Sequence, residues 1–312
     1  FYFFILALFC RKFYGWPKKI IFISLILLMV NSFHLHPHGK PQTLLVTFID
    51  VGQGDSTFIR FPGGKTMLID GGGFPNGDFD TGKNIVAPFL LRQGIWHIDY
   101  LVLTHPHPDH YYGLRYVAKN FSIKEFWTNG DTVNDPCFLE LRKTLTQRKV
   151  ALRKLDSTSP RMLIQGVNVD ILHPPPAYSG SGQSVDARLN NKSLVIKFSY
   201  GNIRFLFSGD IGVDAEKILL STRKGLSADV LKVPHHGSST SSSVSFINLV
   251  GPRVAICPVG FRNPFNLPHP SVLQRFKKNR CPVYRTDLDG ALAIIADGKE
   301  LRVQKLRQDR KP

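Results

Sequence analysis

The chain has 312 residues, of which 43% are apolar, 40 are Lys or Arg and 23 are Asp or Glu, so its formal net charge is +17. The apolar content is high enough for a buried core and excludes a wholly disordered chain. The four cysteines are widely separated and form no C-x-x-C pair, which excludes a disulfide scaffold and a cysteine-rich zinc module. Length alone predicts about two domains.

The basic excess is spread unevenly along the chain. Residues 1–41 hold five basic and no acidic residues, residues 42–298 hold 29 basic and 21 acidic residues, and residues 299–312 hold six basic and two acidic residues. A moderately basic body attracts phosphate polymers and anionic lipid. A well-solvated basic surface is the alternative, so charge is a secondary argument for function.

The N-terminal 39 residues differ in composition from the rest. Residues 1–9 are apolar, residues 11–19 form a basic loop, and residues 20–35 contain no Asp, Glu, Lys or Arg. Because a spanning helix needs about 20 apolar residues, we expect two membrane segments, the first truncated, with the basic loop on the cytoplasmic side. A signal peptide is the alternative. In a multi-pass protein of the inner (plasma) membrane, residues 40–312 would then lie on the outer face.

From residue 42 onward, strands and helices alternate as in an α/β fold. Residues 174–190, rich in Pro, Gly and Ser, are expected to form a mobile loop. Strand–helix alternation in two successive halves predicts two sheets covered by helices on both outer faces. Strands are expected at 43–49, 56–61, 65–69, 99–103, 123–128, 150–155, 167–172, 193–200, 203–207, 229–233, 253–257, 291–296 and 301–305, and helices at 81–92 (capped by Thr81), 110–119, 135–147, 213–221, 243–249 and 270–279.

The strongest chemical signal is the segment 104–110, THPHPDH, which directly follows an apolar strand. Imidazole and carboxylate are the ligands that borderline divalent metals prefer. His105 and His107 are two residues apart, so in extended backbone they point to the same side. Asp109 and His110 lie where the chain turns into a helix. This spacing favours two adjacent metal sites, with a His-rich surface loop as the alternative.

The motif H-x-H-x-D-H resembles that of the metallo-β-lactamase superfamily, and the resemblance extends over residues 42–305. It implies a four-layer αββα sandwich that holds two divalent metal ions, Zn or Mn, at one edge between the sheets. In this resemblance, His105 and His107 hold one metal, and Asp109 and His110 hold the other.

Further positions match polar residues of the superfamily's site. Asp210 follows a late strand and matches the carboxylate that bridges the metals, with a helix N-cap as a compatible alternative. Asp70 matches a carboxylate that orients a metal-bound imidazole, with a turn residue as the alternative. We take His236 as a metal ligand and His235 as an orienting or acid/base group, and the reverse order stays open.

One position departs from the superfamily pattern. The superfamily has a further His about 20 residues before the bridging Asp, but this chain has Asn190, Asn191 and Lys192 there. His173 lies too far upstream to match. Asn191 offers an amide oxygen, which suits Mn²⁺ or Mg²⁺ better than zinc. We therefore expect one metal to be weakly held.

Flanking motifs narrow the resemblance to one family. They are the segments 49–56 (IDVGQGDS), 190–195 (NNKSLV), 231–238 (LKVPHHGS), 268–270 (PHP), 284–287 (YRTD) and 289–291 (DGA). With the hydrophobic N-terminus, they resemble the C-terminal hydrolase domain of the ComEC-type competence proteins, polytopic membrane proteins through which transformable bacteria take up DNA. This resemblance implies a membrane-tethered phosphodiesterase or nuclease that degrades the non-imported strand, with DNA, the membrane and other channel components as partners.

Such a reaction assigns roles to several polar residues. Asp109 or His235 would take the proton from the attacking water, and His269 would face the substrate or protonate the leaving oxygen. The alternative for His269 is an exposed structural histidine. For the serine segment the alternative is a flexible loop, and for Lys192 and Arg285 it is an ordinary surface ion pair. The candidate phosphate contacts are Ser238, Ser239, Lys192 and Arg285.

Two other functions fit the same residues. One is an envelope phosphodiesterase or phosphocholine-esterase-like hydrolase of the same fold, and the other is a non-catalytic DNA-binding module at a channel mouth. The asparagine segment and the membrane tether disfavour β-lactam hydrolysis. We expect two compositional units: residues 1–39 with the membrane segments and basic loop, and residues 40–312 with the hydrolase domain and its basic tail.

Overall fold

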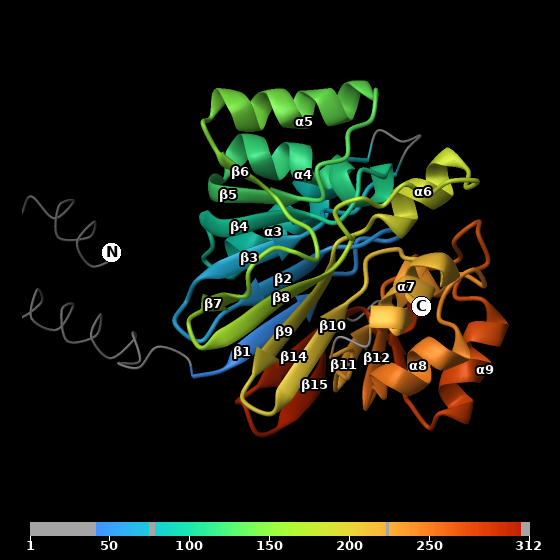
Figure 1. Cartoon of the computed structure of the whole chain (residues 1–312). Coiled ribbons are helices and arrows are strands. Elements are labelled where there is room, and N and C mark those ends of the chain that lie inside the picture. The colour runs from blue at the N-terminus through green and yellow to red at the C-terminus, as the bar shows by residue number, and fades with distance from the viewer. Residues whose placement is uncertain (1–41, 75–78, 223–224, 307–312) are drawn as a thin grey trace, which may run out of the picture. The chain divides into compact units, whose positions relative to one another are not determined.

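The computed structural model describes residues 42–74, 79–222 and 225–306. These residues form two β-sheets packed face to face, with helices on both outer faces (Figure 1). The predicted four-layer αββα sandwich is confirmed. The membrane segments and basic loop expected in residues 1–39 lie outside the described residues. Within the described ranges, every helix is too short or too polar to cross a bilayer.

The first sheet has eight strands, antiparallel on one side and parallel on the other. In spatial order it consists of β15 (Leu301–Leu306), β14 (Ala291–Ala296), β1 (Leu44–Phe48), β2 (Thr57–Arg60), β3 (Thr66–Ile69), β4 (His97–Leu103), β5 (Ser122–Thr128) and β6 (Ala151–Lys154). Neighbours from β15 to β3 are antiparallel, and neighbours from β3 to β6 are parallel. The chain turns that follow β3 and β4 therefore lie at the same edge of the sheet.

The second sheet repeats this division with seven strands. Its spatial order is β13 (Val283–Arg285), β12 (Val254–Cys257), β11 (Val230–Lys232), β10 (Ile203–Phe207), β9 (Val195–Tyr200), β8 (Val167–His173) and β7 (Met162–Ile164). The four strands from β13 to β10 are parallel, and the remaining pairs are antiparallel. The carboxyl ends of β10, β11 and β12 thus form a second common edge.

Helices cover the outer face of each sheet. The first sheet carries η1 (Gly82–Val86), α3 (Ala87–Arg92), α4 (Pro108–Asn120) and α5 (Pro136–Gln147), and the second carries α7 (Val213–Thr222), α8 (Val244–Val250) and α9 (Pro270–Lys278). Three short elements, α6 (Val185–Asn191), η2 (Pro234–Gly237) and α10 (Thr286–Asp289), lie in the connections. In α4, the buried residues Tyr111, Leu114 and Ala118 follow helical spacing, which turns one apolar face onto the sheet.

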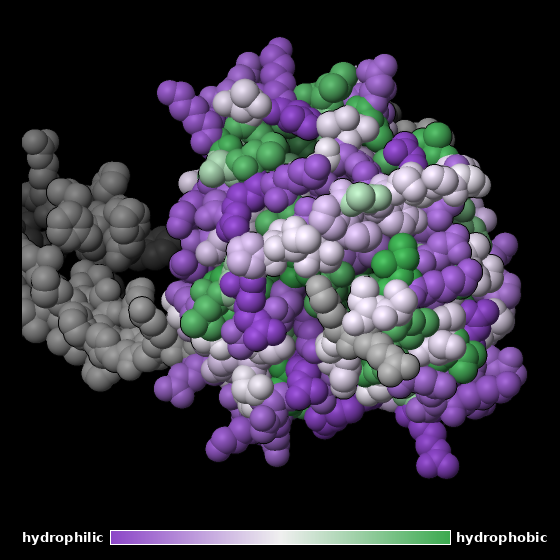
Figure 2. Space-filling model, in the orientation of Figure 1, coloured by the Kyte–Doolittle hydropathy of each residue, from purple (hydrophilic) through white to green (hydrophobic). Residues whose placement is uncertain are grey.

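Large aromatic side chains fill the space between the sheets. Phe48 of β1 stacks on Phe207 of β10 with ring centroids 5.7 Å apart, and Phe61 lies 6.3 Å from Phe198. Each of these side chains is buried and stabilises the fold by about 1.5–3 kcal/mol relative to an exposed position. This rigid core holds the carboxyl edges of both sheets in a fixed relation. Hydrophilic residues dominate the face shown in Figure 2, with hydrophobic areas between them.

Three expectations for local structure differ from the structure. Thr81 does not cap a helix, because its hydroxyl donates to the Gly71 carbonyl at 3.0 Å instead of accepting from the helix. The loop expected at 174–190 contains the start of α6, where the Ser184 hydroxyl accepts from the Ala187 N–H. The elements β7, β13 and α10 were not expected, because three or four residues are too few to set a hydrophobic period.

Candidate metal centre

The His-rich segment lies where β4 ends and α4 begins. The last four residues of β4 are buried, which fixes the position of the segment. Pro108 occupies the first turn of α4, where a missing N–H leaves no hydrogen bond unmade. Asp109 lies in the same turn, where the helix dipole favours a carboxylate. His105 and His110 are fully buried, whereas His107 and Asp109 are partly exposed.

Asp70 holds His110 in place from the neighbouring strand. Because β3 and β4 are parallel, Asp70 at the end of β3 lies beside Thr104 at the end of β4. Asp70 Oδ1 accepts from the Thr104 N–H at 2.9 Å, and Oδ2 accepts from the Thr104 hydroxyl at 2.8 Å. Oδ2 also lies 2.8 Å from His110 Nδ1. This leaves His110 Nε2 facing Asp210, whose Oδ2 is 3.3 Å away.

Asp210 and His236 come from the opposite sheet and meet the α4 residues. Asp210 follows β10, and its Oδ2 lies 3.1 Å from Nε2 of His236, which follows β11. Asp109 Oδ2 lies 3.2 Å from the same nitrogen. The ligand atoms of Asp109, His110, Asp210 and His236 all lie within 4.8 Å of one another. We call these residues the four-ligand group.

A strained turn decides which of the two consecutive histidines joins this group. His235 and His236 both have left-handed backbone, with φ of 49° and 50°, a conformation that costs roughly 1–2 kcal/mol for each residue. His236 Nδ1 lies 2.9 Å from the Pro258 carbonyl, to which it donates, so Nε2 is turned into the site. His235 points to Asn190, whose Nδ2 lies 3.5 Å from His235 Nε2.

His105 and His107 form a separate part of the site, which we call the histidine pair. Their ring centroids are 4.7 Å apart, and the His105 ring lies 4.2 Å from the His110 ring. Ser193 Oγ is 3.2 Å from His105 Nδ1. The Nε2 atoms of His105 and His107 are buried without a hydrogen-bond partner. Within the described residues, no group of three His, Cys, Asp or Glu ligand atoms includes either member of the pair.

The two asparagines at the end of α6 have different positions. Asn191 Oδ1 accepts from the Gly212 N–H at 2.8 Å, and its amide donates to Gln183. The Asn191 oxygen expected as a weak metal ligand therefore contacts the backbone instead. His173 lies 2.6 Å from the main-chain carbonyl of Asn191 and supports this end of α6. Asn190 lies beside His235, and its own Oδ1 is buried without a partner.

Sequence reasoning missed a buried lysine and its aspartate partner. Lys232, at the end of β11, is 3% exposed, and its Nζ donates to Asp210 Oδ1 at 3.0 Å and to the Gly209 carbonyl at 2.8 Å. It also pairs with Asp55. The sequence did contain a signal for Lys232, because a lysine between apolar residues of a buried strand needs a buried partner. Lys232 and Asp55 were considered only as parts of the family motifs 231–238 and 49–56.

The tight turn before Asp55 needs glycine. Gly54 has φ of +111°, and a Cβ on it would lie 2.2 Å from the Asp109 carbonyl oxygen. The Asp55 N–H donates to that same carbonyl at 3.2 Å. The glycine therefore allows the backbone of this turn to approach the start of α4 and brings the Asp55 carboxylate to Lys232.

The charges within the site shift each other's pKa in opposite directions. Burial raises the pKa of Asp210, but His236, Lys232 and His110 outweigh it and hold this pKa well below its usual range. Likewise, His110 and His236 overcome burial and lower the pKa of Asp109 to about 2. Burial lowers the pKa of His236, but the carboxylates outweigh it and raise this pKa to about 10. At neutral pH the four-ligand group therefore has ionised carboxylates and a protonated His236, whose proton a bound metal ion would replace.

The histidine pair has the opposite electrostatic character. Burial, together with the neighbouring His110 and His107, lowers the pKa of His105 well below its ordinary value. Burial also lowers the pKa of His107. Both imidazoles are therefore neutral at pH 7, which is the form that binds metals.

The predicted phosphate contacts lie in varied surroundings. Lys192 is paired with Asp131, and Arg285 Nε donates to Asp287 at 2.9 Å, so both cations have a partner within the chain. The Ser238 N–H donates to the His235 carbonyl at 2.8 Å. Ser239 is exposed. Of the four residues, only the two serines directly follow η2 (Pro234–Gly237), which contains His235 and His236 and which we call the histidine turn.

His269 lies at the start of α9. Its Nδ1 accepts from the Ser271 N–H at 3.2 Å, so it caps the helix. Its own N–H donates to the Gly237 carbonyl at 2.9 Å, which ties α9 to the histidine turn. Because Nδ1 accepts a hydrogen bond, the neutral ring carries its proton on Nε2.

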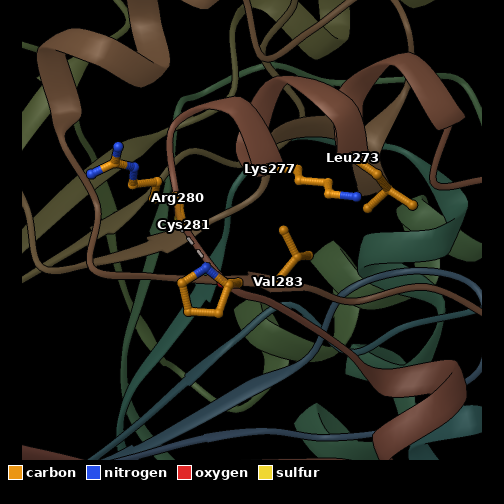
Figure 3. Close-up of a pocket in the computed structure, with 6 residues that line it drawn as sticks. Leu273, Lys277, Arg280, Cys281 and Val283 are labelled. Atoms are coloured by element: carbon orange, nitrogen blue, oxygen red, sulfur yellow. Dashed lines mark hydrogen bonds between the residues drawn. The ribbon is translucent and has the colours of Figure 1, made fainter.

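A pocket of about 400 Å³ lies elsewhere (Figure 3). It is lined by Leu273, Lys277, Arg280, Cys281, Pro282 and Val283, from α9 and the segment before β13. Because β13 is parallel to β12 and pairs Val283 with Ala255, the pocket lies toward the amino ends of these strands. The metal-ligand residues follow the carboxyl ends, so the pocket is not part of the candidate centre.

The residues present fit divalent metal ions. The Nε2 atoms of His105 and His107 are buried without a hydrogen-bond partner, and leaving such groups buried without one is costly. His110 Nε2 and His236 Nε2 face the carboxylates of the four-ligand group. These four nitrogens and two carboxylates form an N/O set that suits zinc, manganese or iron. A second acidic cluster, Asp55, Asp70 and His110, is already balanced by Lys232 and by the Thr104 hydrogen bonds.

Comparison with known proteins agrees with this centre. The sequence profile of the metallo-beta-lactamase superfamily matches residues 49–136, which include the His-rich segment. Among solved structures, CmlA, a diiron beta-hydroxylase from Streptomyces venezuelae, is similar over 84% of this chain and 54% of its own, with a TM-score of 0.52 and 13% identity. At this identity the likeness supports the fold alone.

Curated relatives are similar over most of the chain. ComE operon protein 3 of Bacillus subtilis is 30% identical over 79% of this chain and 32% of its own length. Competence protein ComA of Neisseria gonorrhoeae is 28% identical over 90% of this chain and 37% of its own, and recombination protein 2 of Haemophilus influenzae is 30% identical over 90% and 32%. The chain thus spans about a third of these relatives. It belongs to the ComEC-type competence proteins and carries their metallo-β-lactamase-fold domain.

Proposed function

We propose that the chain is a metal-dependent phosphodiesterase that cleaves DNA during DNA uptake and degrades the strand that is not imported. The observation that carries this proposal is the four-ligand group beside the histidine pair, at the common edge of the two sheets. The names of the relatives, which refer to competence and recombination, point to DNA as the substrate.

The four-ligand group and the histidine pair would each contribute to binding divalent metal ions. Asp109, His110, Asp210 and His236 would hold one ion, and the histidine pair would take part in holding a second. Bound divalent ions, Mn²⁺ or Zn²⁺, supply Lewis acidity toward a phosphoryl oxygen and strengthen water as a nucleophile near neutral pH. Asp70 keeps the His110 ring in the required orientation through its 2.8 Å contact with Nδ1.

Two side chains are suited to accept the proton of the attacking water. Burial lowers the pKa of His235, so its imidazole is neutral and basic at pH 7. The Asp109 side chain is 26% exposed, compared with 3% for Asp210, so it is the carboxylate of the group that solvent and substrate reach. We assign proton transfer to His235 and Asp109.

The leaving oxygen and the phosphate need donors. His269, with its proton on Nε2, would face the substrate and donate a hydrogen bond to the leaving oxygen, and it could transfer a proton only from its doubly protonated form. Ser238 and Ser239 follow the histidine turn and offer their hydroxyl groups to a phosphate. Lys192 and Arg285 would serve only after exchanging their present carboxylate partners. The excess of basic residues in the body adds a long-range attraction for DNA.

We further propose that the domain works at a membrane. The apolar runs in the N-terminal segment are the sequence feature that supports a tether, with residues 40–312 on the outer face of the inner membrane. DNA, the membrane and other components of an uptake channel are the proposed partners. This arrangement would place the hydrolase where an incoming duplex is separated into strands.

Incubation of the purified chain with linear DNA and Mn²⁺ or Zn²⁺ tests the proposed activity. We expect cleavage that needs the metal and that falls at least 1,000-fold in His107→Ala and Asp109→Ala. Glu140→Ala, on the exposed side of α5, is a matched control and should cleave normally. Metal content measured on the same samples shows whether inactivity reflects lost metal or lost chemistry.

The assay also separates the alternatives. Cleavage of bis(4-nitrophenyl) phosphate without cleavage of DNA would identify an envelope phosphodiesterase of the same fold. Salt-dependent DNA binding that survives His107→Ala, with metal bound and no cleavage, would identify a binding module. Either result would replace the proposed nuclease.

A further inference from the structure

The segment between β12 and α9 is fixed to the candidate centre at both ends. At its start, the Pro258 carbonyl accepts from His236 Nδ1 at 2.9 Å. At its end, the His269 N–H donates to the Gly237 carbonyl at 2.9 Å. Both anchors contact the histidine turn, so the residues between them, 260–267, which we call the aromatic loop, begin and end beside that turn.

One side chain organises the interior of the aromatic loop. Asn263 Nδ2 donates to the Gly260 carbonyl at 3.0 Å and to the Leu267 carbonyl at 2.7 Å. Its Oδ1 accepts from the N–H groups of Phe265 and Leu267 at 3.2 and 3.0 Å. The Gly260 N–H also donates to Gln53. The loop therefore holds a defined shape while its two phenyl rings stay outside the core, against which only Leu267 packs among its large apolar side chains.

The loop exposes two phenyl rings. Phe261 is 57% exposed and Phe265 is 63% exposed. The Arg262 guanidinium lies 5.1 Å from the centre of the Phe261 ring, and the Arg262 backbone has φ of 50°. Such a backbone is strained for a residue with a side chain, and strain of this kind gathers at functional sites. The loop thus presents aromatic faces and one cation to the solvent.

The length of the chain limits how far the rings can lie from the histidine turn. Phe261 is three residues from Pro258 and Phe265 is four from His269, so they lie at most about 11 and 14 Å, between Cα atoms, from residues that touch the histidine turn. A DNA strand that leaves the centre along this side of the molecule would bring its unpaired bases to the rings.

We propose that the aromatic loop is a stacking platform for unpaired bases, so that the enzyme takes single-stranded DNA in preference to duplex. This inference rests on the proposed function. Aromatic side chains stack on the faces of unpaired bases, and Arg adds a cationic contact. In a duplex those faces are already stacked on each other. The proximity of the loop to the metal centre favours a nucleic acid over a lipid surface as its occupant.

Binding without cleavage tests the platform. Fluorescence anisotropy in EDTA compares a labelled 12-nucleotide oligothymidine with a duplex of equal length. We expect Phe261→Ala and Phe265→Ala each to weaken single-strand binding about tenfold and duplex binding less than twofold. Phe261→Tyr should retain the affinity, whereas Phe261→Leu, which keeps apolar bulk without a ring, should not.

Trp96→Ala is the matched control. Trp96 is 68% exposed, and it precedes β4, so the length of that strand, roughly 23 Å, separates it from the His-rich segment. This variant should bind both DNA forms as the parent does. Circular dichroism of all variants checks that the fold is kept.

Three outcomes would overturn the platform. Equal loss for single-stranded and duplex DNA would indicate a general backbone contact. Unchanged binding in both Phe variants would remove the loop from the interface. Loss of binding to vesicles of one part phosphatidylglycerol and three parts phosphatidylcholine, with DNA binding intact, would identify a lipid-contacting loop. Because the assay runs in EDTA, an absence of nuclease activity would count against the proposed function and leave this test standing.

Discussion

The four-ligand group and the histidine pair begin in the same seven residues but differ in what the second sheet brings to them. Asp109 and His110 meet Asp210 and His236, and all four ligand atoms lie within 4.8 Å. His105, by contrast, meets the hydroxyl of Ser193. The His-rich segment alone therefore does not determine metal binding, because two of the four ligands of the four-ligand group come from the opposite sheet.

Charge separates the two parts further. The four-ligand group contains two carboxylates, and cations around Asp210 hold its pKa well below the usual range. The histidine pair contains only neutral imidazoles. A divalent cation gains more from anionic than from neutral ligands, so we expect two ions to bind with unequal affinity. Four predictions follow from this difference.

The largest effect is expected for Asp210→Asn. Asp210 contacts His110, His236 and Lys232, so the amide removes an anionic ligand and leaves the buried ammonium with one carboxylate partner. We predict loss of the tight metal and at least a 1,000-fold fall in hydrolysis, measured by metal content and by initial rate. Asp214→Asn, in the exposed part of α7, is the control. Retention of tight metal in Asp210→Asn would place the main site elsewhere.

Lys232→Met should separate stability from metal affinity. Without metal, Asp55 and Asp210 would lose their buried cation, and breaking such a pair costs about 3–5 kcal/mol. With metal, the removed positive charge no longer repels the ion, so metal should bind more tightly and recover much of the stability. Denaturant unfolding with and without Mn²⁺ measures this. Equal destabilisation in both conditions would mean that Lys232 does not act on the metal.

Asn190→His should raise the metal affinity of the histidine pair toward that of the four-ligand group. Asn190 has a buried Oδ1 without a partner. It lies in the chain between Asp186, whose Oδ1 is 3.8 Å from His107 Nε2, and Ser193, whose Oγ is 3.2 Å from His105 Nδ1. We therefore expect an imidazole at this position to add a nitrogen near the histidine pair. We predict about tenfold tighter binding of the second ion, measured by equilibrium dialysis, with Asn202→His in the β9–β10 turn as control. An unchanged second affinity would show that Asn190 does not face the pair.

The smallest effect is a pH dependence of stability that comes from His173. Burial lowers the pKa of His173 to about 4, whereas the unfolded chain has an ordinary value of about 6.5. The folded state thus favours neutral His173, and its contribution is complete above pH 6.5 and is lost as pH falls toward 4. This amounts to about 3 kcal/mol. In His173→Phe, unfolding curves between pH 7 and 4 should change less than in the parent.

The fold could be read from the sequence because its signals are local. Apolar strands, Pro108 at a helix start and the spacing of His105 to His110 each lie within a few residues. Even so, Asn191 was expected to offer its amide oxygen to a metal, whereas that oxygen accepts from the Gly212 N–H and Asn190 is the asparagine beside His235. Consecutive residues of a helix point about 100° apart, and the helix α6 was not foreseen.

The contacts across the two sheets could not be read in the same way. Lys232, Asp55 and Asp210 lie far apart in sequence and meet only because β10 and β11 end beside the Gly54 turn. The choice of His236 over His235 depends on two left-handed residues that no local preference predicts. Sequence patterns identify ligand types, whereas the register between elements decides which ligands meet.

Titration of the purified chain with Mn²⁺, followed by isothermal calorimetry, measures how much the metal affinities of the four-ligand group and the histidine pair differ. We predict two binding events that differ at least tenfold in affinity, with the tighter event lost in Asp210→Asn and the weaker event lost in His107→Ala. Two events of equal affinity, or loss of the tighter event in His107→Ala with Asp210→Asn unchanged, would show that the histidine pair and not the four-ligand group is the principal metal site.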